Sequence, residues 1–301
     1  MHEIRLCADE NDEAASLAIY NAIWPHSAIT MDEVRSFKSR TLDYGDFLGP
    51  GGSVAVAVMP QRPDVGFVLL TVLPEHRHRG VGSALYLEVS AWLAERGVHR
   101  IDARVSEDDE ESLAFAKRRG FQEVERNRRM ILDLTALEPR PIDPPAGVEV
   151  IAWAERLDLA AGIYEVACEA FPDIPSAEDE LMEPFEDWLA HEMQGSGDLP
   201  EATFLALLGS EVGGYSKFSL TAAQPTTANH DMTGVKRAWR GRGIAGALKR
   251  AQIAWAKEQG YERLATQNEL RNEPIRRLNA RLGYREAPGV IIVRGPLANN
   301  G

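Results

Sequence analysis

The sequence predicts two tandem copies of one mixed α/β domain. Residues 72–82, VLPEHRHRGVG, align without a gap with residues 235–245, VKRAWRGRGIA, at an offset of 163 residues. The alignment continues for about 50 residues, and a period of this length indicates a duplicated domain rather than a solenoid of short units. The chain of 301 residues is long enough for two domains of ordinary size, and each half shows the same order of strands and helices.

Each copy opens on a short strand followed by one or two helices. The strand is HEIRLC (2–7) in the first copy and VEVIAW (148–153) in the second. Thr30 and Glu33 form a capping-box pattern that predicts a helix through about Phe37. Ser176 and Asp179 predict a similar start for a helix through about Met193.

The middle and end of each copy alternate strands with helices. A glycine-rich loop leads into a long amphipathic helix, and a second helix starts near Asp109 or Asn272, both good N-cap residues. The expected strands are 53–58, 65–72, 98–105 and 128–134 in the first copy, and 202–208, 213–220, 261–267 and a last strand in the second. The expected helices are about 81–96 and 109–119, matched by about 244–259 and 272–282. We pair 53–58 and 65–72 with 202–208 and 213–220, and we assign 128–134 to the first domain as its final strand.

The two copies are joined by residues 136–147, ALEPRPIDPPAG. Its four prolines exclude a regular helix and predict a semi-rigid, extended linker. The predicted domains are therefore 1–135 and 148–301, with 136–147 between them.

Composition limits the partners. Hydrophobic residues make up 44% and charged residues 26%, which is typical of a globular protein. The net charge of −13 argues against nucleic acid as a partner and suits a cationic amine. No apolar run approaches the roughly 18–20 residues needed to cross a membrane, and Cys7 and Cys168 are too few for a disulfide framework or a zinc site. We expect a cytoplasmic protein with no metal, membrane or nucleic-acid partner.

The repeated loop carries the main chemical signal. An apolar strand runs into Arg77-His78-Arg79-Gly80-Val81-Gly82 and then directly into a helix. Such a junction directs several backbone N–H groups and the positive end of the helix dipole at one spot, which favours a pyrophosphate. The Gly-Lys-Ser/Thr ending of a P-loop is absent, and the lone G-x-G-x-x-G string at 241–246 lacks a counterpart in the first copy.

The shared pattern, R-x-x-G-x-G/A, resembles the acetyl-CoA loop of the GNAT superfamily of N-acetyltransferases. The resemblance rests on V-x-P-E-x-R-x-x-G-x-G at 72–82 and on Gly120-Phe121 and Gly283-Tyr284, and its two-domain arrangement is similar to mycothiol synthase and other tandem GNAT proteins. It implies a central mixed, mostly antiparallel twisted sheet flanked by helices in each domain. It also implies a monomer whose two domains pack as a pseudo-dimer.

The resemblance implies roles for particular residues. Backbone groups of Val72 and Leu73, or Val235 and Lys236, would pair with the pantetheine arm and the thioester. Asn272 matches a position where the family often has an asparagine in contact with the cofactor, and Asp109 takes that position in the first copy. The amides expected to hold the pyrophosphate are those of Arg77, His78, Arg79, Gly80, Val81, Gly82 and Ser83, and of Arg240, Gly241, Arg242, Gly243, Ile244, Ala245 and Gly246.

Catalytic groups are expected in the second copy. The tyrosine that often acts as general acid in the family is replaced by Ala116 and Asn279, although Asn279 could still donate a hydrogen bond to sulfur. The strand before the loop has no titratable residue in the first copy, whereas the second offers Asp231 as base or amine anchor and His230 as second choice. The predicted function is acetyl-CoA-dependent acetylation of a primary amine on a small molecule, by direct attack in a ternary complex. Two alternatives stay open: a non-catalytic acyl-CoA sensor or scaffold, and a protein-lysine acetyltransferase.

Overall fold

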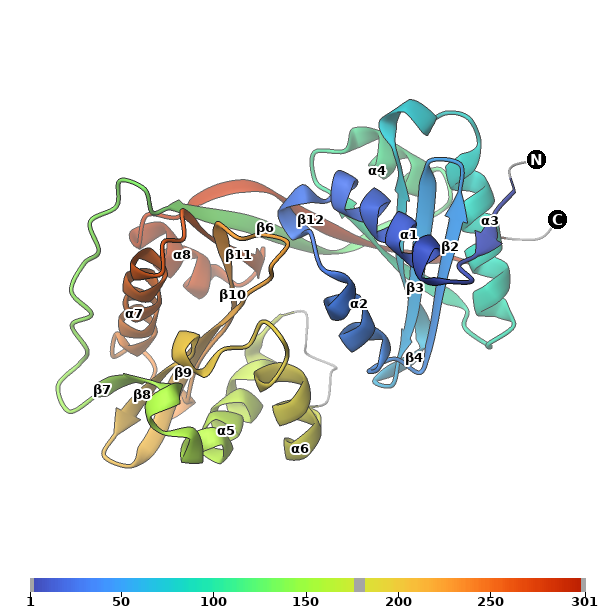
Figure 1. The fold of residues 1–301 in the computed structure, drawn as a ribbon. Helices are drawn as coiled ribbons and strands as arrows, with labels where there is room; N and C mark the ends of the chain where they lie inside the picture. Colours follow the sequence, from blue (N-terminus) through green and yellow to red (C-terminus); the bar gives the residue numbers. More distant parts are fainter. Residues whose placement is uncertain (1–2, 176–181, 299–301) are drawn as a thin grey trace. The chain divides into compact units, whose positions relative to one another are not determined.

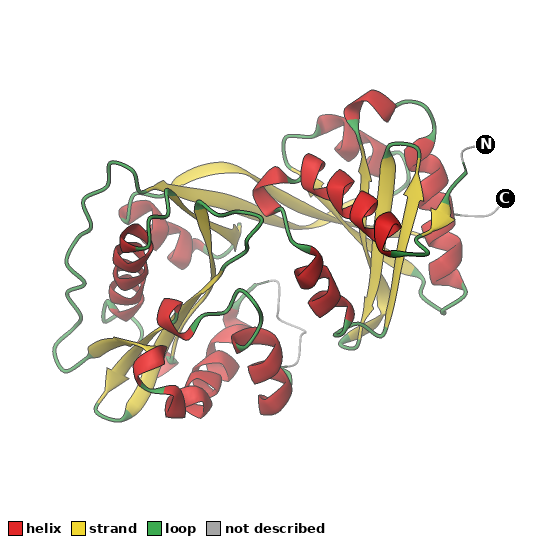
Figure 2. Ribbon diagram, in the orientation of Figure 1, coloured by secondary structure: helices red, strands yellow, loops and turns green. Residues whose placement is uncertain are grey.

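The chain divides into two compact units in the computed structural model, which describes residues 3–175 and 182–298 (Figure 1). Unit 1 comprises Met1–Arg126 with Pro288–Gly301, and unit 2 comprises Asn127–Ala287. Each unit is a mixed, mostly antiparallel sheet flanked by helices, as Figure 2 shows. The predicted fold class is therefore confirmed.

The sheet of unit 1 has the strand order β1-β2-β3-β4-β5-β12. Its neighbours are antiparallel except β4 and β5, which run parallel from Val65↔Arg100 to Val68↔Ala103. The strands are β1 (Arg5–Leu6), β2 (Asp43–Gly49), β3 (Gly52–Met59), β4 (Arg62–Val72), β5 (Arg100–Ser106) and β12 (Arg285–Pro296).

Unit 2 repeats this order as β7-β8-β9-β10-β11-β6. Here the parallel pair is β10 and β11, joined from Thr227↔Arg263 to His230↔Thr266. The strands are β7 (Glu149–Ala152), β8 (Phe204–Leu208), β9 (Glu211–Ser219), β10 (Thr227–Val235), β11 (Arg263–Glu269) and β6 (Gln122–Asp133). In both units the parallel strands stop pairing before their ends, which leaves the backbone beyond that point open.

The last strand of each copy completes the sheet of the other. Residues 127–133 of β6 pair with β11, and residues 290–296 of β12 pair with β5 in the same register. Residues 128–134, expected as the final strand of the first domain, therefore join the sheet of unit 2 instead. The two copies offer these strands equivalent sites, so exchange preserves the local pairing while joining different parts of the chain. The boundaries 1–135 and 148–301 stay a prediction of what was duplicated.

Helices cover both faces of each sheet. In unit 1, α1 packs on the face to which Ser53 points, because Ser53 Oγ lies near the Ser16 carbonyl, whereas α3 packs against Gly52 on the opposite face. The helices of unit 1 are α1 (Glu10–Ile23), α2 (Met31–Lys38), α3 (Val81–Ala94) and α4 (Glu110–Lys117). Those of unit 2 are α5 (Ala160–Ala170), α6 (Phe185–Trp188), α7 (Ile244–Glu258) and α8 (Glu273–Arg281).

Local signals succeed where side chains cap a helix. Thr30 accepts from the Glu33 amide and the Glu33 carboxylate accepts from Thr30, so the predicted capping box is confirmed at α2. Asp109 caps α4, whereas Asn272 makes no capping bond at α8. The predicted start at Ser176 and Asp179 lies outside the described residues; α6 begins at Phe185 and continues as a π-helical turn, Leu189–Met193.

The predicted correspondence of the middle strands, 53–58 and 65–72 with 202–208 and 213–220, was wrong by one strand. Strand β2, DYGDFLG, was missed because aspartate and glycine are depleted in strands. At the 163-residue offset, the end of β4 at Val72 corresponds to the end of β10 at Val235, not to β9. The strand that precedes the loop is therefore β4 in unit 1 and β10 in unit 2.

The linker is extended, and it packs onto unit 2. Arg250 of α7 donates to the carbonyls of Ile142 (2.7 Å) and Asp143 (3.1 Å). Lys257, two turns further along α7, donates to the Leu134 carbonyl at 3.3 Å and to the Leu137 carbonyl. These bonds tie residues 134–143 along the helix that begins at the glycine loop.

Candidate active site

The glycine loop of unit 2 forms an open cradle of backbone amides. Gly241 and Gly243 hold φ values of +75° and +90°, which glycine adopts without steric cost, and α7 starts at the next residue, Ile244. Within the described part of the chain, the amides of 241–246 have no hydrogen-bond acceptor. Free amides at the positive end of a helix favour an anion, and phosphate in particular.

Arg240 and Arg77, the first residues of the two predicted pyrophosphate-binding segments, make hydrogen bonds within the protein instead. The Arg240 amide donates to the Arg237 carbonyl at 3.3 Å, and its Nε donates to the Val235 carbonyl at 2.9 Å. Arg77 repeats both bonds in unit 1, to Pro74 at 3.2 Å and Val72 at 3.3 Å. These arginines hold the end of the strand against the loop, and their amides are already used.

At the end of each strand before the loop, two residues were predicted to pair with the cofactor, and the backbone of the second is already hydrogen-bonded within the protein. Lys236 donates its amide to Gly213 and accepts at its carbonyl from Trp239; Leu73 is bound in the same way by Gly51 and His76. Because backbone groups alternate between the two sides of a strand, those of Val235 and Val72 point away from β9 and β3. They face the gap where β10 and β11, or β4 and β5, have separated.

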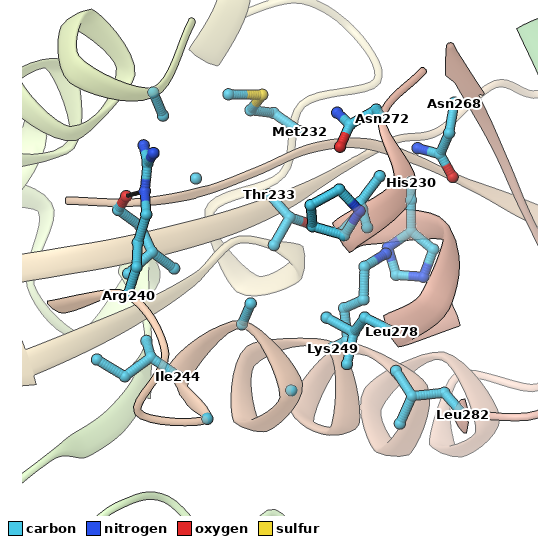
Figure 3. Close-up of a pocket in the computed structure, with 18 of the residues that line it drawn as sticks. His230, Met232, Thr233, Arg240, Ile244, Lys249, Asn268, Asn272, Leu278 and Leu282 are labelled. Atoms are coloured by element: carbon cyan, nitrogen blue, oxygen red, sulfur yellow. Dashed lines mark hydrogen bonds between the residues drawn. The ribbon is translucent and has the colours of Figure 1, made fainter. Parts of the chain in front are cut away.

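A cavity of about 1130 Å³ extends from the unit 2 loop into that gap (Figure 3). Its walls come from β10, the loop, α7, β11, α8 and the linker at 143–145. Nine of the ten predicted cofactor residues of unit 2 line it: Val235, Arg240, Gly241, Arg242, Gly243, Ile244, Ala245, Gly246 and Asn272, with Lys236 outside. Figure 3 shows Asn272 and Asn268 on the side of the cavity opposite α7.

The corresponding cavity of unit 1 is smaller, about 660 Å³, and acidic groups hold its loop. Asp109 pairs with the Arg77 guanidinium at 3.0 Å, and Glu111 contacts Arg77 at 3.2 Å and His78 at 3.3 Å. Hydrogen bonds from Arg77 and His78 lower the pKa of Glu111, so its carboxylate stays charged. The predicted cofactor residues that line this cavity are Val72, Arg77, His78, Gly80, Gly82 and Ser83, whereas Leu73, Arg79 and Val81 do not.

The two loops therefore differ in charge. At the 163-residue offset, Asp109 and Glu111 of unit 1 correspond to Asn272 and Pro274 of unit 2. The Asn272 side chain makes no hydrogen bond within the described residues, so its amide is free to meet a ligand. In unit 2 a carboxylate also holds the loop arginine, since Asp173 lies 2.6 Å from Arg240, but the positions that match Asp109 and Glu111 carry no charge.

Asp231 lies in a β-bulge at the cavity. His230 pairs with Phe218 and Thr233 with Ser216, so β10 has one extra residue between them, a feature that redirects side chains. The Asp231 side chain is 40% exposed, and its Oδ2 lies 2.8 Å from the Nζ of the buried Lys217. Burial lowers the pKa of Lys217, but Asp231 and Asp198 outweigh burial and raise it above its ordinary value. The pair fixes a carboxylate at the edge of the cavity.

His230 faces inward from the preceding position. Its Nε2 is hydrogen-bonded to the Tyr284 hydroxyl, and its ring packs 4.7 Å from the ring of Phe218. Burial, with a smaller contribution from Lys249, lowers the pKa of His230 well below its ordinary value. The imidazole is therefore neutral and buried, unlike the exposed carboxylate of Asp231.

Asn279 does not reach the cavity. The side chain is fully buried, and its Nδ2 donates to Asn268 Oδ1 at 2.8 Å. Asn268 lines the cavity and Asn279 does not, so Asn279 positions Asn268 in this structure. The predicted hydrogen bond from Asn279 to sulfur is not supported by its position.

Sequence reasoning missed three buried polar residues around His230. Lys249 and Gln252 from α7 and Tyr284 before β12 are each at most 4% exposed. With His230 they form what we call the polar cluster. The repeat itself could have revealed it, because unit 1 carries the following residues at the offset positions: Phe67, Tyr86, Val89 and Phe121. A core that is mainly apolar in one copy and polar in the other marks the second as specialised, since buried polar groups cost stability.

The chain belongs to the acetyltransferase (GNAT) family, whose profile matches residues 4–121 and 160–284. The two matched segments correspond to the two copies, and the family performs acetyl transfer from acyl-coenzyme A. The chain is thus a tandem GNAT acetyltransferase.

Solved structures show the same fold. A tandem GNAT protein from the clavulanic acid biosynthesis pathway, solved without acetyl-CoA, is 20% identical with a TM-score of 0.78 over 100% of both chains. A GCN5-related N-acetyltransferase from Sphaerobacter thermophilus is 20% identical with a TM-score of 0.76, over 99% of this chain and 96% of that one. A GNAT acetyltransferase from Colwellia psychrerythraea is 15% identical with a TM-score of 0.64, over 98% and 100%. No curated protein matches the sequence significantly.

Within 3–175 and 182–298, no helix is long and apolar enough to cross a membrane. Over the same ranges, no group of three or more histidine, cysteine, aspartate or glutamate side chains is placed to hold a metal ion.

Proposed function

We propose that unit 2 transfers the acetyl group of acetyl-CoA to a primary amine of a small molecule, by direct attack in a ternary complex. The observation that carries this proposal is the difference between the two loops. Asn272 and Pro274 leave the unit 2 cradle open, whereas Asp109 and Glu111 hold the unit 1 loop with negative charge.

The donor side of the proposal follows the cavity. The free amides of 241–246 would hold the pyrophosphate, as anions bind at helix N-termini. The Val235 carbonyl already accepts from Arg240, so the Val235 amide, which faces the gap beside β11, would pair with the pantetheine arm and lead the thioester toward the bulge. The acetyl group would then lie near Asp231 and Thr233, both of which line the cavity.

The acceptor side depends on Asp231. Its carboxylate would bind the ammonium form of the substrate and accept the proton that the amine must lose before attack. The buried Lys217 holds this carboxylate in place, because its Nζ lies 2.8 Å from Asp231 and 2.7 Å from Asp198. The net charge of −13 adds long-range attraction for a cationic acceptor.

The test is calorimetric titration of the full chain with acetyl-CoA, using a matched pair of variants. Ala245→Glu and Gly82→Glu place a carboxylate at equivalent positions of the two loops, within the first helical turn, where neither residue needs a positive φ. We expect one binding event that Ala245→Glu removes and Gly82→Glu retains. Loss of binding only in Gly82→Glu would overturn the assignment to unit 2.

A second candidate is a protein that binds acyl-CoA without transferring the acyl group. It is favoured by the absence of a hydroxyl donor at position 279, where a buried asparagine lies. Release of free coenzyme A in the presence of a broad amine panel separates the two. Binding without release for any amine would favour a sensor, and Asp231→Asn should reduce turnover at least tenfold if transfer occurs.

A further inference from the structure

Lys249 is a buried amine without a hydrogen-bond or ion-pair partner among the described residues, at the wall of the proposed acetyl-CoA site. Its side chain is among the largest that are fully buried, at 1% exposure. No hydrogen bond or ion pair to Lys249 occurs within 3–175 and 182–298. An unpaired buried amine destabilises a protein, so its retention calls for a functional reason.

The helix places Lys249 directly after the loop. It lies four residues after Ala245 and three after Gly246, so all three share one face of α7, and all three line the cavity. One helical turn, about 5.4 Å, separates Lys249 from the pyrophosphate cradle along the axis. Figure 3 shows its side chain rising from α7 toward His230.

The groups around the amine are neutral. His230 faces it from β10, and the Tyr284 ring centroid lies 5.7 Å from Lys249 Nζ. Leu278 and Leu282 of α8 line the cavity beside it, and Gln252 lies one turn further along α7. Burial lowers the pKa of Lys249 to about 7, with no contribution from a carboxylate. Near neutral pH the amine therefore exists in both the charged and the uncharged form.

We propose that the Lys249 ammonium gives the proton to the sulfur of coenzyme A when the acetyl group leaves. This inference rests on the proposed function. The acceptor ammonium first gives one proton through Asp231 to water, and the neutral amine then attacks. Its nitrogen forms a bond to the carbonyl carbon and gives a second proton to the Asp231 carboxylate, which releases it to water. The carbon–sulfur bond breaks with its electron pair going to sulfur, and Lys249 protonates that sulfur. The neutral lysine amine regains a proton from water after the products leave.

The relative acid strengths of the Lys249 ammonium and the coenzyme A thiol favour proton transfer from Lys249 to sulfur. A cysteine thiol has a pKa of about 8.5, and an ammonium that titrates near 7 passes its proton downhill to a thiolate of that basicity or higher. This assignment supplies the donor that Ala116 and Asn279 do not. In unit 1 the equivalent residue is Tyr86, whose hydroxyl is engaged with the Pro296 carbonyl at 2.9 Å, so the device belongs to unit 2 alone.

The first experiment needs no turnover. The thiol of bound coenzyme A is titrated by its ultraviolet absorbance in the unmodified protein, in Lys249→Met and in Lys257→Met. Lys257 lies two turns along the same helix and bonds to the linker, so its variant is the matched control. Once the pair has lost its first proton near a pH of about 7, the sulfur and Lys249 share the remaining one. Part of the thiolate absorbance should therefore appear near that pH in the unmodified protein and in Lys257→Met, whereas Lys249→Met should titrate in one step at higher pH.

Each outcome is decisive. Equal thiol pKa values in the three proteins would overturn the role of Lys249 while leaving the proposed function intact. Failure of the unmodified protein to bind coenzyme A would overturn the proposed function, and this inference with it. Where an amine substrate is found, kcat of Lys249→Met should fall about 100-fold with little change in the Kd of acetyl-CoA. The decline of kcat above a pH of about 7 should disappear in the variant. A residue that only supports the structure would lower kcat without removing this pH dependence, and Lys249→Gln provides an independent replacement.

Discussion

Asp102 and Arg294 lie 192 residues apart in sequence and form a two-pronged ion pair in unit 1. Arg294 Nε and Nη2 donate to the two carboxylate oxygens at 2.7 and 2.8 Å. The Asp102 side chain is 2% exposed and also accepts from Arg62 at 3.1 Å. Since Arg294 belongs to β12 and Asp102 to β5, the pair fastens the exchanged strand to its sheet.

Removing the Arg294 side chain should destabilise unit 1. Arg294→Met leaves a buried carboxylate with one of its two arginines, and we expect a loss of roughly 2–3 kcal/mol. Urea unfolding measures it. Arg100→Met is the control, because Arg100 lies on β5, the strand of Asp102, but pairs with the exposed Asp64. Such surface pairs contribute less than about 1 kcal/mol. Equal losses in the two variants would contradict the role of Asp102.

Replacing His78 by glycine should stabilise the protein. His78 holds φ at +58°, in the left-handed region, where the second copy has Gly241 at +75°. Glycine removes a strain of about 1 kcal/mol, and the loss of the exposed contact to Glu111 subtracts little from this gain. The urea midpoint should rise for His78→Gly and fall for Gly241→His. A fall for both would show that the Glu111 contact outweighs the strain.

Exchanging charge between the loops should move anion binding from one unit to the other. Asn272→Asp places a carboxylate beside the unit 2 cradle and should weaken acetyl-CoA binding about tenfold, equivalent to about 1.4 kcal/mol. Asp109→Asn combined with Glu111→Gln frees Arg77 and His78 and should create a weak second binding event. Calorimetry on the full chain reports both. A double variant that still shows one event would mean that charge alone does not close the unit 1 loop.

The stability of unit 2 should increase with pH above about 7. Burial lowers the pKa of Lys249 from 10.5 to about 7, so between these values the unfolded chain binds more protons than the folded chain. The free energy of unfolding therefore rises with pH across this range, by as much as roughly 5 kcal/mol, and is lowest below about 7. Urea unfolding at several pH values measures the slope. Lys249→Met should flatten it and raise stability at neutral pH; an unchanged slope would contradict the burial of a charged amine.

Much of the fold was predictable because the two copies within the chain can be aligned with each other. The repeat located both loops and both long helices, and Thr30 with Glu33 located α2. The exchange of β6 and β12 was not predictable, because Asp133 meets Arg263 in the same register in which Pro296 meets Arg100. Local sequence preferences are identical for either choice of partner.

The site was predictable where titratable residues lie on the strand that precedes the loop. His230 and Asp231 stood out because β10 carries polar residues where β4 has none. Lys249 was missed because a lysine within the segment ALKRAQ of an amphipathic helix suggests an exposed position. Only packing shows that this side chain turns inward, beside His230 and Tyr284.

The exchange of strands also sets the order in which the protein can be made. While the ribosome is still synthesising the second copy, β5 has no partner on one edge, because that partner is residues 290–296. The first copy, although translated first, cannot complete its sheet before those residues emerge. Contacts between such distant segments slow folding, since long loops must close first. The nascent chain therefore carries an open sheet edge for most of its synthesis, and a chaperone that shields such edges would act on the first copy.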